Sequence, residues 1–244
     1  MRHDVDVKRH SWRLVALLSV LGIAGLATML FAPIEQLLPP TVQVPRIALL
    51  IQPAILVVLF AALGWWAAPK ASLDAPVLGA LADRGDWAGP LRKALGPAIL
   101  GGAACGVVIA SFEIVARAYT HGRAQAFDMP LVTRMLYGGT VEELIFRWGL
   151  LSVLVAMASK LRAPPATGFW IANLLVALLF GAGHVPGIML TAANPPGWLP
   201  WAIILANSVI GLICGWLFAR RGFEAAMIAH ALAHLVSAPL IAAG

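Results

Sequence analysis

Long apolar stretches limit the folds that this chain can adopt. A bilayer core about 30 Å thick requires roughly 20 apolar residues per helix, and lipid leaves unpaired backbone groups unsatisfied, which excludes open strands. Because 61% of the residues are hydrophobic and only 11% are charged, a water-soluble fold would have too little polar surface. The sequence predicts an all-α, polytopic transmembrane helical bundle with about seven spans, although eight would also fit. The expected spans are 12–32, 46–68, 94–118, 130–158, 168–190, 198–219 and 223–243.

The positions of lysine and arginine predict the orientation of the bundle, because positive residues are retained on the cytoplasmic side. If the N-terminus is cytoplasmic, that side receives Arg2, Lys8, Arg9, Arg13, Lys70, Arg84, Arg92, Lys93, Lys160, Arg162, Arg220 and Arg221. The opposite side receives only Arg46, Arg117, Arg123 and Arg134. We therefore expect a multi-pass protein of a bacterial-type plasma membrane, with its N-terminus in the cytoplasm. The basic residues form no single stripe, which argues against nucleic-acid binding.

Ionisable residues divide the chain into two parts. Residues 1–127 are expected to form N-terminal transmembrane helices and an amphipathic connection between Lys70 and Lys93. Residues 128–244 contain most of the ionisable groups within spans, and such groups are costly enough at bilayer depth to need a partner or a purpose. We therefore expect the chemistry of the protein in residues 128–244. The groups are Glu142, Glu143, Arg147, His184, His230 and His234.

Helical spacing sorts the two adjacent glutamates. Residues four apart share a helix face, so Glu143 is expected to pair with Arg147 and to leave Glu142 as a free carboxylate on another face. A desolvated glutamate near a histidine suits general-base catalysis, and His184 is its natural companion.

The same spacing applies to three further sets of residues. His230 and His234 are four apart and address one surface. Phe180 shares a face with His184 and is expected to pack. Glu113 and Arg117 have the spacing of an ordinary structural pair.

Several other membrane proteases are excluded by their signatures. A rhomboid-like serine protease requires a GxSG turn, which does not occur. A presenilin-like enzyme requires two aspartates within spans, and none of the aspartates lies deep in one. A zincin requires HExxH, but neither His184 nor His230 is followed by glutamate.

Three motifs in order resemble those of the CPBP family, which includes the CAAX prenyl endopeptidases and the Abi-like bacteriocin self-immunity proteins. The run from Glu142 to Arg147, EELIFR, resembles its EExxxR motif. The run from Phe180 to His184, FGAGH, resembles its FxxxH motif. The run HALAH resembles HxxxN or HxxxD, with His234 in place of the family's Asn or Asp. The resemblance covers roughly residues 128–240, whereas the first 127 match only in hydropathy.

This resemblance implies an intramembrane endopeptidase. Glu142 and His184 would activate a water molecule to hydrolyse a peptide bond of a membrane-associated or lipid-anchored substrate. His230, supported by His234, would stabilise the oxyanion. Glu143, Arg147 and Phe180 would give structural support. Membrane lipid and a peptide or protein substrate are the expected partners.

Alternatives remain open at this point. The first choice is a metal-free site, but a zinc site formed by His184, His230, His234 and Glu142 also suits these residue types. A non-catalytic immunity or scaffold protein and a proton-coupled transporter are alternative functions. Residue counting also places His184 nearer the outer side than Glu142. Their convergence would require a broken helix near Pro186, a different helix start or a different number of spans.

Overall fold

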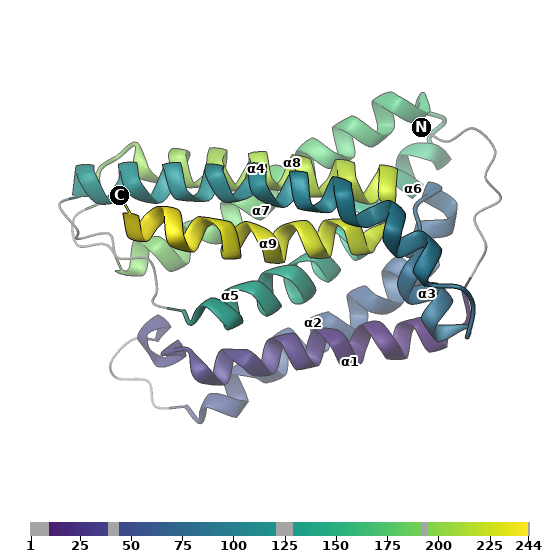
Figure 1. Cartoon of the computed structure of the whole chain (residues 1–244), viewed down its shortest axis with the longest axis horizontal. Coiled ribbons are helices and arrows are strands. Elements are labelled where there is room, and N and C mark those ends of the chain that lie inside the picture. The colour runs from purple at the N-terminus through teal and green to yellow at the C-terminus, as the bar shows by residue number, and fades with distance from the viewer. Residues whose placement is uncertain (1–9, 39–43, 121–128, 192–194, 244) are drawn as a thin grey trace.

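The computed structural model describes residues 10–38, 44–120, 129–191 and 195–243, and the regular structure within these ranges is helical (Figure 1). The α-helices are α1 (Arg13–Ala27), α2 (Arg46–Ala67), α3 (Pro76–Ala82), α4 (Ala88–Thr120), α5 (Leu131–Leu136), α6 (Ser152–Lys160), α7 (Pro165–Thr191), α8 (Leu199–Arg221) and α9 (Phe223–Ala243). Short 3₁₀ turns are η1 (Thr28–Phe31), η2 (Ile34–Leu37) and η3 (Ala68–Ala71). Two π-helical segments, η4 (Tyr137–Glu142) and η5 (Leu144–Leu151), connect α5 to α6.

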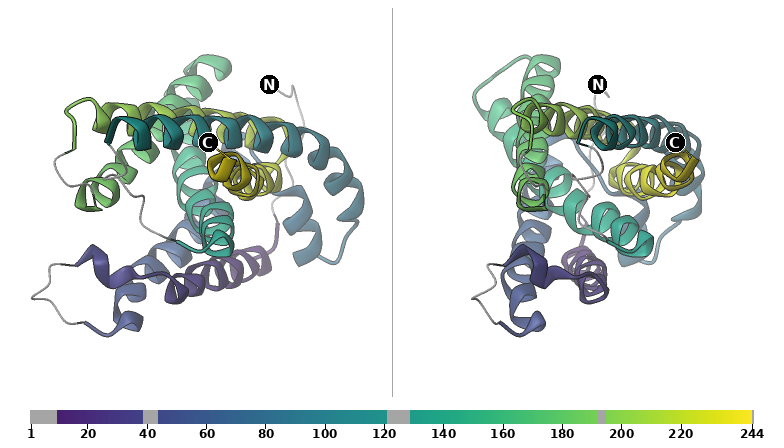
Figure 2. Two further views of the ribbon diagram at one scale, coloured as in Figure 1. Left: turned by 60° about the vertical axis from the view of Figure 1, so that its left-hand side comes forward. Right: turned by 90° about the vertical axis from the view of Figure 1, so that its left-hand side faces the viewer.

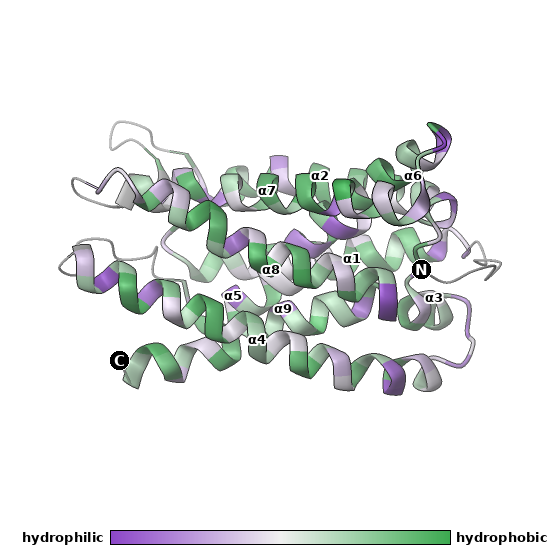
Figure 3. Ribbon diagram, turned by 90° about the horizontal axis from the view of Figure 1, so that it is seen from above, coloured by the Kyte–Doolittle hydropathy of each residue, from purple (hydrophilic) through white to green (hydrophobic). Residues whose placement is uncertain are grey.

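Six helical segments in the described residues are long and apolar enough to cross a membrane, and each matches one of the spans expected from the sequence. Many of their outward side chains are apolar, including Ile55, Leu100 and Leu205. Figure 3 shows the same predominance of hydrophobic residues along the long helices. The predicted all-α membrane bundle is therefore confirmed, and the chain is an integral membrane protein. The six segments are Arg13–Phe31, Arg46–Ala71, Ala88–Tyr119, Pro165–Gly187, Leu199–Arg221 and Phe223–Ala243.

The remaining expected span, 130–158, is helical but not uniformly α-helical. It runs from α5 through η4 and η5 to α6, and it carries Glu142, Glu143 and Arg147. In a π-helix each amide bonds to the carbonyl five residues earlier, and such wide turns are frequent at functional sites. These three charged residues thus lie on the least regular part of the composite helix.

Close helix packing positions α9, which carries two of the histidines. Figures 1 and 2 show α4 running alongside α9 for most of its length. Gly102 and Gly106 of α4 face this helix: a Cβ atom would lie 2.8 Å from the Ala229 carbonyl oxygen at Gly102 and 2.9 Å from the Ala233 carbonyl oxygen at Gly106. Small residues four apart permit this close approach within a membrane. The predicted division at 127/128 lies outside the described residues, but α4 and α9 join the two parts in one bundle.

The short helix α3 is attached to the beginning of α9. One oxygen of the buried Glu224 side chain, Oε1, accepts hydrogen bonds from the backbone amides of Val77 at 3.1 Å and Leu78 at 2.7 Å. These amides belong to the first turn of α3, where the helix itself offers no acceptor. Glu224 therefore caps α3 from another helix. This contact attaches the segment 70–93, which the sequence predicted as an amphipathic connection, to α9.

Candidate active site

Glu142 lies between two imidazole rings from distant parts of the chain. Its Oε1 atom is 3.7 Å from His184 Nε2 in α7, and its Oε2 atom is 3.6 Å from His230 Nε2 in α9. Glu142 itself ends η4, so three helical elements supply one cluster. The structure thus brings together the carboxylate and the two histidines that the sequence singled out.

The depth of His184 is explained by the helix boundaries. Helix α7 is continuous from Pro165 to Thr191 and includes Pro186, so no break in it is needed. Helix α6 ends at Lys160 and α7 begins at Pro165, so Glu142 and His184 lie a similar number of residues from the turn between them. An equal number of helical residues gives a similar distance along antiparallel neighbours. The expectation that His184 lies nearer the outer side than Glu142 is therefore wrong, since the two side chains meet at 3.7 Å.

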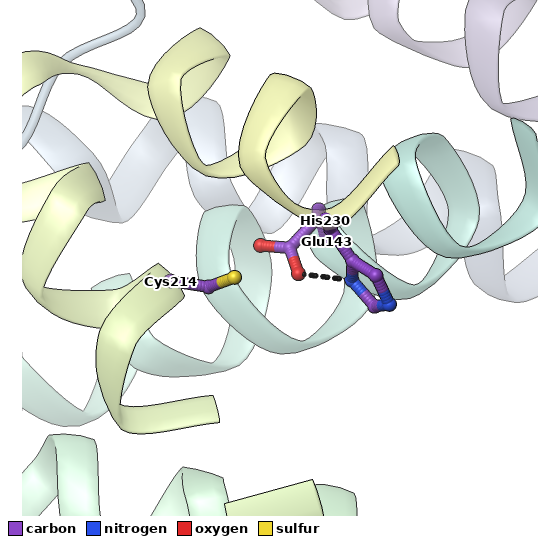
Figure 4. A group of neighbouring side chains, drawn as sticks. All are labelled: Glu143, Cys214 and His230. Atoms are coloured by element: carbon purple, nitrogen blue, oxygen red, sulfur yellow. Dashed lines mark hydrogen bonds and ion pairs between the residues drawn. The ribbon is translucent and has the colours of Figure 1, made fainter. Parts of the chain in front are cut away.

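Glu143 connects the composite helix to α9. Its Oε1 atom lies 2.7 Å from His230 Nδ1, the interaction drawn in Figure 4, and 3.1 Å from Arg147 Nη1. Glu143 is completely buried and Arg147 is 1% exposed. The expected pair of Glu143 and Arg147 is therefore present. The hydrogen bond to His230 was missed, because helical spacing cannot reveal a contact between residues so far apart in the chain.

The hydrogen bonds of the two histidines determine which ring atoms carry protons. The Phe180 carbonyl oxygen, 2.8 Å from His184 Nδ1, can only accept a hydrogen bond, and an ionised Glu143 can only accept one from His230 Nδ1. Both Nδ1 atoms therefore hold protons, which leaves the Nε2 atoms of neutral rings as acceptors facing Glu142. The Glu142 carboxylate and two imidazole acceptors therefore face one another at the cavity, an arrangement that suits general acid–base chemistry.

His234 extends the cluster along α9. Its ring stacks on that of His230, with centroids 5.4 Å apart and planes inclined by 29°. Its Nδ1 atom is buried and has no hydrogen-bond partner among the described residues. A polar ring atom beside the site is therefore not used in hydrogen bonds between the described residues.

Gly138 makes room for both histidines of α9. A Cβ atom there would lie 2.9 Å from His230 Nε2 and 3.2 Å from His234 Nε2. The sequence analysis missed this residue. The available signal was a pair of glycines, Gly138 and Gly139, shortly before Glu142 within a span.

Phe180 packs at the centre of the site, as its place on the helix face predicted. Its ring makes edge-to-face contacts with Phe146 at 5.2 Å and with His184 at 4.6 Å between centroids. The guanidinium carbon of Arg147 lies 4.3 Å from the centroid of the Phe180 ring, a cation–π contact. Phe180 therefore supports His184 and Arg147 together.

A cavity of about 410 Å³ opens over these residues. Glu142, His184, His230 and His234 all line it, among mainly apolar neighbours such as Ile109. This volume lies within the usual range of ligand pockets. Arg134 and Tyr137 also line the cavity, and the sequence analysis assigned neither of them to the site.

No three residues of the alternative zinc set, all described by the structure, bring their ligand atoms within 4.8 Å of one another. Within the part of the chain that the structure describes, the group of three ligand residues that lie within 4.8 Å of one another is Glu143, Cys214 and His230 (Figure 4). Glu143 and His230 already bond to each other, and Glu143 also faces Arg147. The alternative set of His184, His230, His234 and Glu142 has suitable donor atoms, but these atoms are more widely spread.

One carboxylate and two imidazoles therefore face a cavity within a membrane bundle, an arrangement suited to hydrolysis within the membrane. Residues 124–236 match the family model of the Rce1-like type II CAAX prenyl endopeptidases. The match includes all three motifs and confirms the resemblance of this segment to the CPBP and CAAX protease family. Comparisons with curated proteins and with solved structures gave no match.

Proposed function

We propose that the protein is an intramembrane endopeptidase in which Glu142 and His184 activate water for attack on a peptide bond. The observation that carries this proposal is the position of the Glu142 carboxylate, within 3.7 Å of two imidazole Nε2 atoms and on the wall of the cavity. General-base catalysis requires a proton acceptor that reaches the attacking water in a site with limited access to solvent. Glu142 meets both requirements.

The proposed reaction moves one proton and forms no covalent enzyme intermediate. Glu142, assisted by His184, removes a proton from water as the water oxygen bonds to the carbonyl carbon. The tetrahedral oxyanion then collapses, the C–N bond breaks, and the proton passes to the leaving nitrogen. Preorganised donors that face the developing negative charge would accelerate these steps.

His230 is the proposed oxyanion donor, and its surroundings favour that role. Because its Nδ1 proton is directed to Glu143, donation from Nε2 requires the protonated ring. Carboxylates face this ring on both sides, with Glu142 Oε2 3.6 Å from Nε2 and Glu143 Oε1 2.7 Å from Nδ1. His234 would assist, since an imidazole N–H can replace the amide donor of the family's usual asparagine.

The proposed substrate is a membrane-associated or lipid-anchored peptide. The cavity has mainly apolar walls and lies among helices whose outer faces suit lipid. The family's name refers to prenylated CAAX proteins, so S-prenylated peptides are the first substrates to test.

The decisive experiment measures cleavage of fluorogenic prenyl-cysteine and lipid-anchored peptides by the purified full chain in detergent. We expect wild type to cleave, and Glu142→Ala to lose a factor of about 10² to 10⁴ in kcat, the usual contribution of a general base. Glu113→Gln is the matched control, because Glu113 lines the same cavity but pairs with Arg117 at 3.2 Å. Equal rates for wild type and Glu142→Ala would refute the assignment.

Further arms of the experiment distinguish the alternatives. Loss of cleavage with a zinc chelator, together with zinc in the purified protein, would favour the His184, His230, His234 and Glu142 metal site. An inert wild type that supports ion flux in proteoliposomes, with the flux lost in Glu142→Gln, would favour a transporter. A cellular function retained by Glu142→Ala would favour an immunity or scaffold protein.

A further inference from the structure

A second cavity lies where α8 turns into α9, and it shares no lining residue with the cavity that contains Glu142. Figure 1 shows α3 beside the beginnings of α4 and α9 at this end of the bundle. The volume of the second cavity is about 200 Å³. Gly222 alone separates α8 from α9, and its φ of 98° lies in the left-handed region that glycine adopts readily. A Cβ atom there would lie 2.5 Å from Pro76 Cδ, so the turn packs directly against α3.

Three basic side chains line this second cavity. Lys93 lies near the start of α4, and Arg220 and Arg221 are the last two residues of α8. None of the three forms an ion pair with an acidic side chain of the described residues. Asp74 also lines the cavity, but its Oδ1 atom lies 2.9 Å from His10 Nε2, which is its charged partner. The cavity therefore has an excess of positive charge.

A smaller cavity of about 80 Å³ adjoins the second cavity at Arg220. Ala219 and Arg220 line both cavities, so only the end of α8 stands between them. The smaller cavity has mainly apolar and aromatic walls, including Trp170 of α7 and Trp216 of α8. Both tryptophans are exposed on the outside of the bundle, and such residues are typical of the level of lipid headgroups. A cationic cavity thus lies next to an aromatic one at the edge of the membrane.

The two cavities together suit a phosphate group that is attached to a hydrocarbon chain. Guanidinium groups bind phosphate oxygens with two parallel hydrogen bonds, and a lysine adds a point charge. A free phosphate would use the cationic cavity alone and leave the tryptophan-lined cavity unfilled. The membrane-spanning part of α8 ends at Arg221, which places the cations at headgroup level. The orientation predicted from lysine and arginine puts them in the cytoplasmic leaflet, where basic pockets between helices bind anionic headgroups.

We propose that the turn between α8 and α9 is a binding site for an anionic phospholipid. Lys93, Arg220 and Arg221 bind its phosphate, and an acyl chain lies against Trp170 and Trp216. The excess of positive charge selects a headgroup with net negative charge over phosphatidylcholine, because the cations repel the choline ammonium. The bound lipid bridges α4 and α8. The inference does not depend on the proposed endopeptidase function.

The test measures lipid binding to the purified full chain by native mass spectrometry, with phosphatidylglycerol and phosphatidylcholine as probes. In wild type we expect phosphatidylglycerol to bind more tightly. The triple substitution Lys93→Gln, Arg220→Gln and Arg221→Gln should lower the affinity for phosphatidylglycerol roughly a hundredfold, at about fivefold for each cation removed. It should leave the affinity for phosphatidylcholine almost unchanged.

A second triple variant is the matched control. Arg92→Gln, Lys160→Gln and Arg162→Gln remove the same charge from exposed residues that line neither cavity, and this variant should keep the wild-type preference. Both triple variants should have the wild-type Tm in phosphatidylcholine nanodiscs, because all six side chains are exposed. Adding phosphatidylglycerol should raise the Tm of wild type and of the control only. Equal losses of binding in the two variants, or no preference in wild type, would overturn the inference.

A further arm distinguishes a lipid from a free anion, with inorganic phosphate as the competing probe. We expect phosphate to displace phosphatidylglycerol poorly from wild type. Trp216→Ala should weaken the binding of phosphatidylglycerol, whereas Trp201→Ala, at the exposed start of α8, should not. If phosphate binds as tightly as phosphatidylglycerol and Trp216→Ala changes neither affinity, the site binds free phosphate and the lipid assignment is wrong.

Discussion

Glu143 contacts two side chains of the site, and this double contact holds His230 and Arg147 to one carboxylate. Its Oε1 atom faces both His230 Nδ1 and Arg147 Nη1, whereas Oε2 is buried and has no hydrogen-bond partner among the described residues. The guanidinium is within ion-pair distance of the carboxylate, but its Nη atoms do not meet hydrogen-bond geometry with it. A buried network with incomplete hydrogen bonding tolerates the loss of a member poorly.

Arg147→Ala is accordingly expected to damage folding more than chemistry. It would leave the Glu143 carboxylate buried without its cation, a change that typically costs about 3–5 kcal/mol. The measurement is thermal unfolding of the purified variant in detergent, together with its yield. Arg117→Ala is the control, since the Arg117 side chain is 53% exposed and its ion pair should contribute at most about 1 kcal/mol. Normal yield and stability with lost activity would contradict this prediction and would assign Arg147 a direct role.

At the scale of elements, the beginning of α1 is held against the end of α3. His10 Nε2 lies 2.9 Å from Asp74 Oδ1, and His10 Nδ1 lies 3.2 Å from Asp83 Oδ2. Gly79 of α3 leaves the space that the imidazole ring occupies. Trp65 of α2 adds a hydrogen bond from its indole to the His10 carbonyl oxygen at 2.8 Å. Three elements therefore meet at one histidine outside the apolar spans.

This contact predicts a dependence of stability on pH. The hydrogen bond to Asp74 is the main cause that raises the pKa of His10 above its ordinary value of 6.5, and the Coulombic attraction of Asp74 and Asp83 adds to it against the opposing effect of burial. The folded state binds this proton more tightly than the unfolded state does, so the contact stabilises fully below pH 6.5 and weakens as pH rises through the raised pKa. We expect the difference in Tm between wild type and His10→Gln to be largest at about pH 6 and to shrink by about pH 9.

Two variants make this prediction specific. Asp74→Asn removes the main charged partner, and in its background His10→Gln should change Tm much less. A Tm difference that stays constant over the whole range would show that His10 contributes by packing alone.

At the scale of the whole molecule, the arrangement of helix ends supports one orientation in the membrane. Figure 1 places α3, the end of α6 and the start of α9 at one end of the bundle, and the start of α5 at the other. The first end carries described basic residues at Arg84, Lys160 and Arg221, whereas the second carries Arg134. Among the other basic residues used to predict orientation, Arg2, Lys8, Arg9 and Arg123 lie outside the described residues.

We therefore propose that the end with α3 and α6 faces the cytoplasm, with the C-terminus on the opposite side. A fusion of alkaline phosphatase after residue 244 should be active in cells, and a fusion of green fluorescent protein at the same point should be dark. Fusions in the turn between α6 and α7 should behave in the opposite way. The reverse pattern would invert the proposed topology while leaving the arrangement of the site unchanged.

Features that depend on local periodicity and on the cost of charge in lipid could be predicted from the sequence alone. Apolar length was sufficient for the helical bundle, because unpaired backbone groups are not tolerated in hydrocarbon. Spacing of four residues was sufficient for the pairs Glu143–Arg147 and Glu113–Arg117, because such neighbours lie on one helix face. The rarity of ionisable groups within spans identified Glu142 and His184 before any contact was known.

How these groups meet depends on the packing of the helices and could not be predicted from the sequence. The contact of His230 with Glu143, the space above Gly138 and the place of Arg134 on the cavity wall all depend on how α5, η4 and α9 cross. Helix crossing is determined by the packing of side chains over the whole bundle, and no local pattern encodes it. The composite helix adds a second reason, since its π-helical turns change the angles between side chains that an α-helical reading assumes.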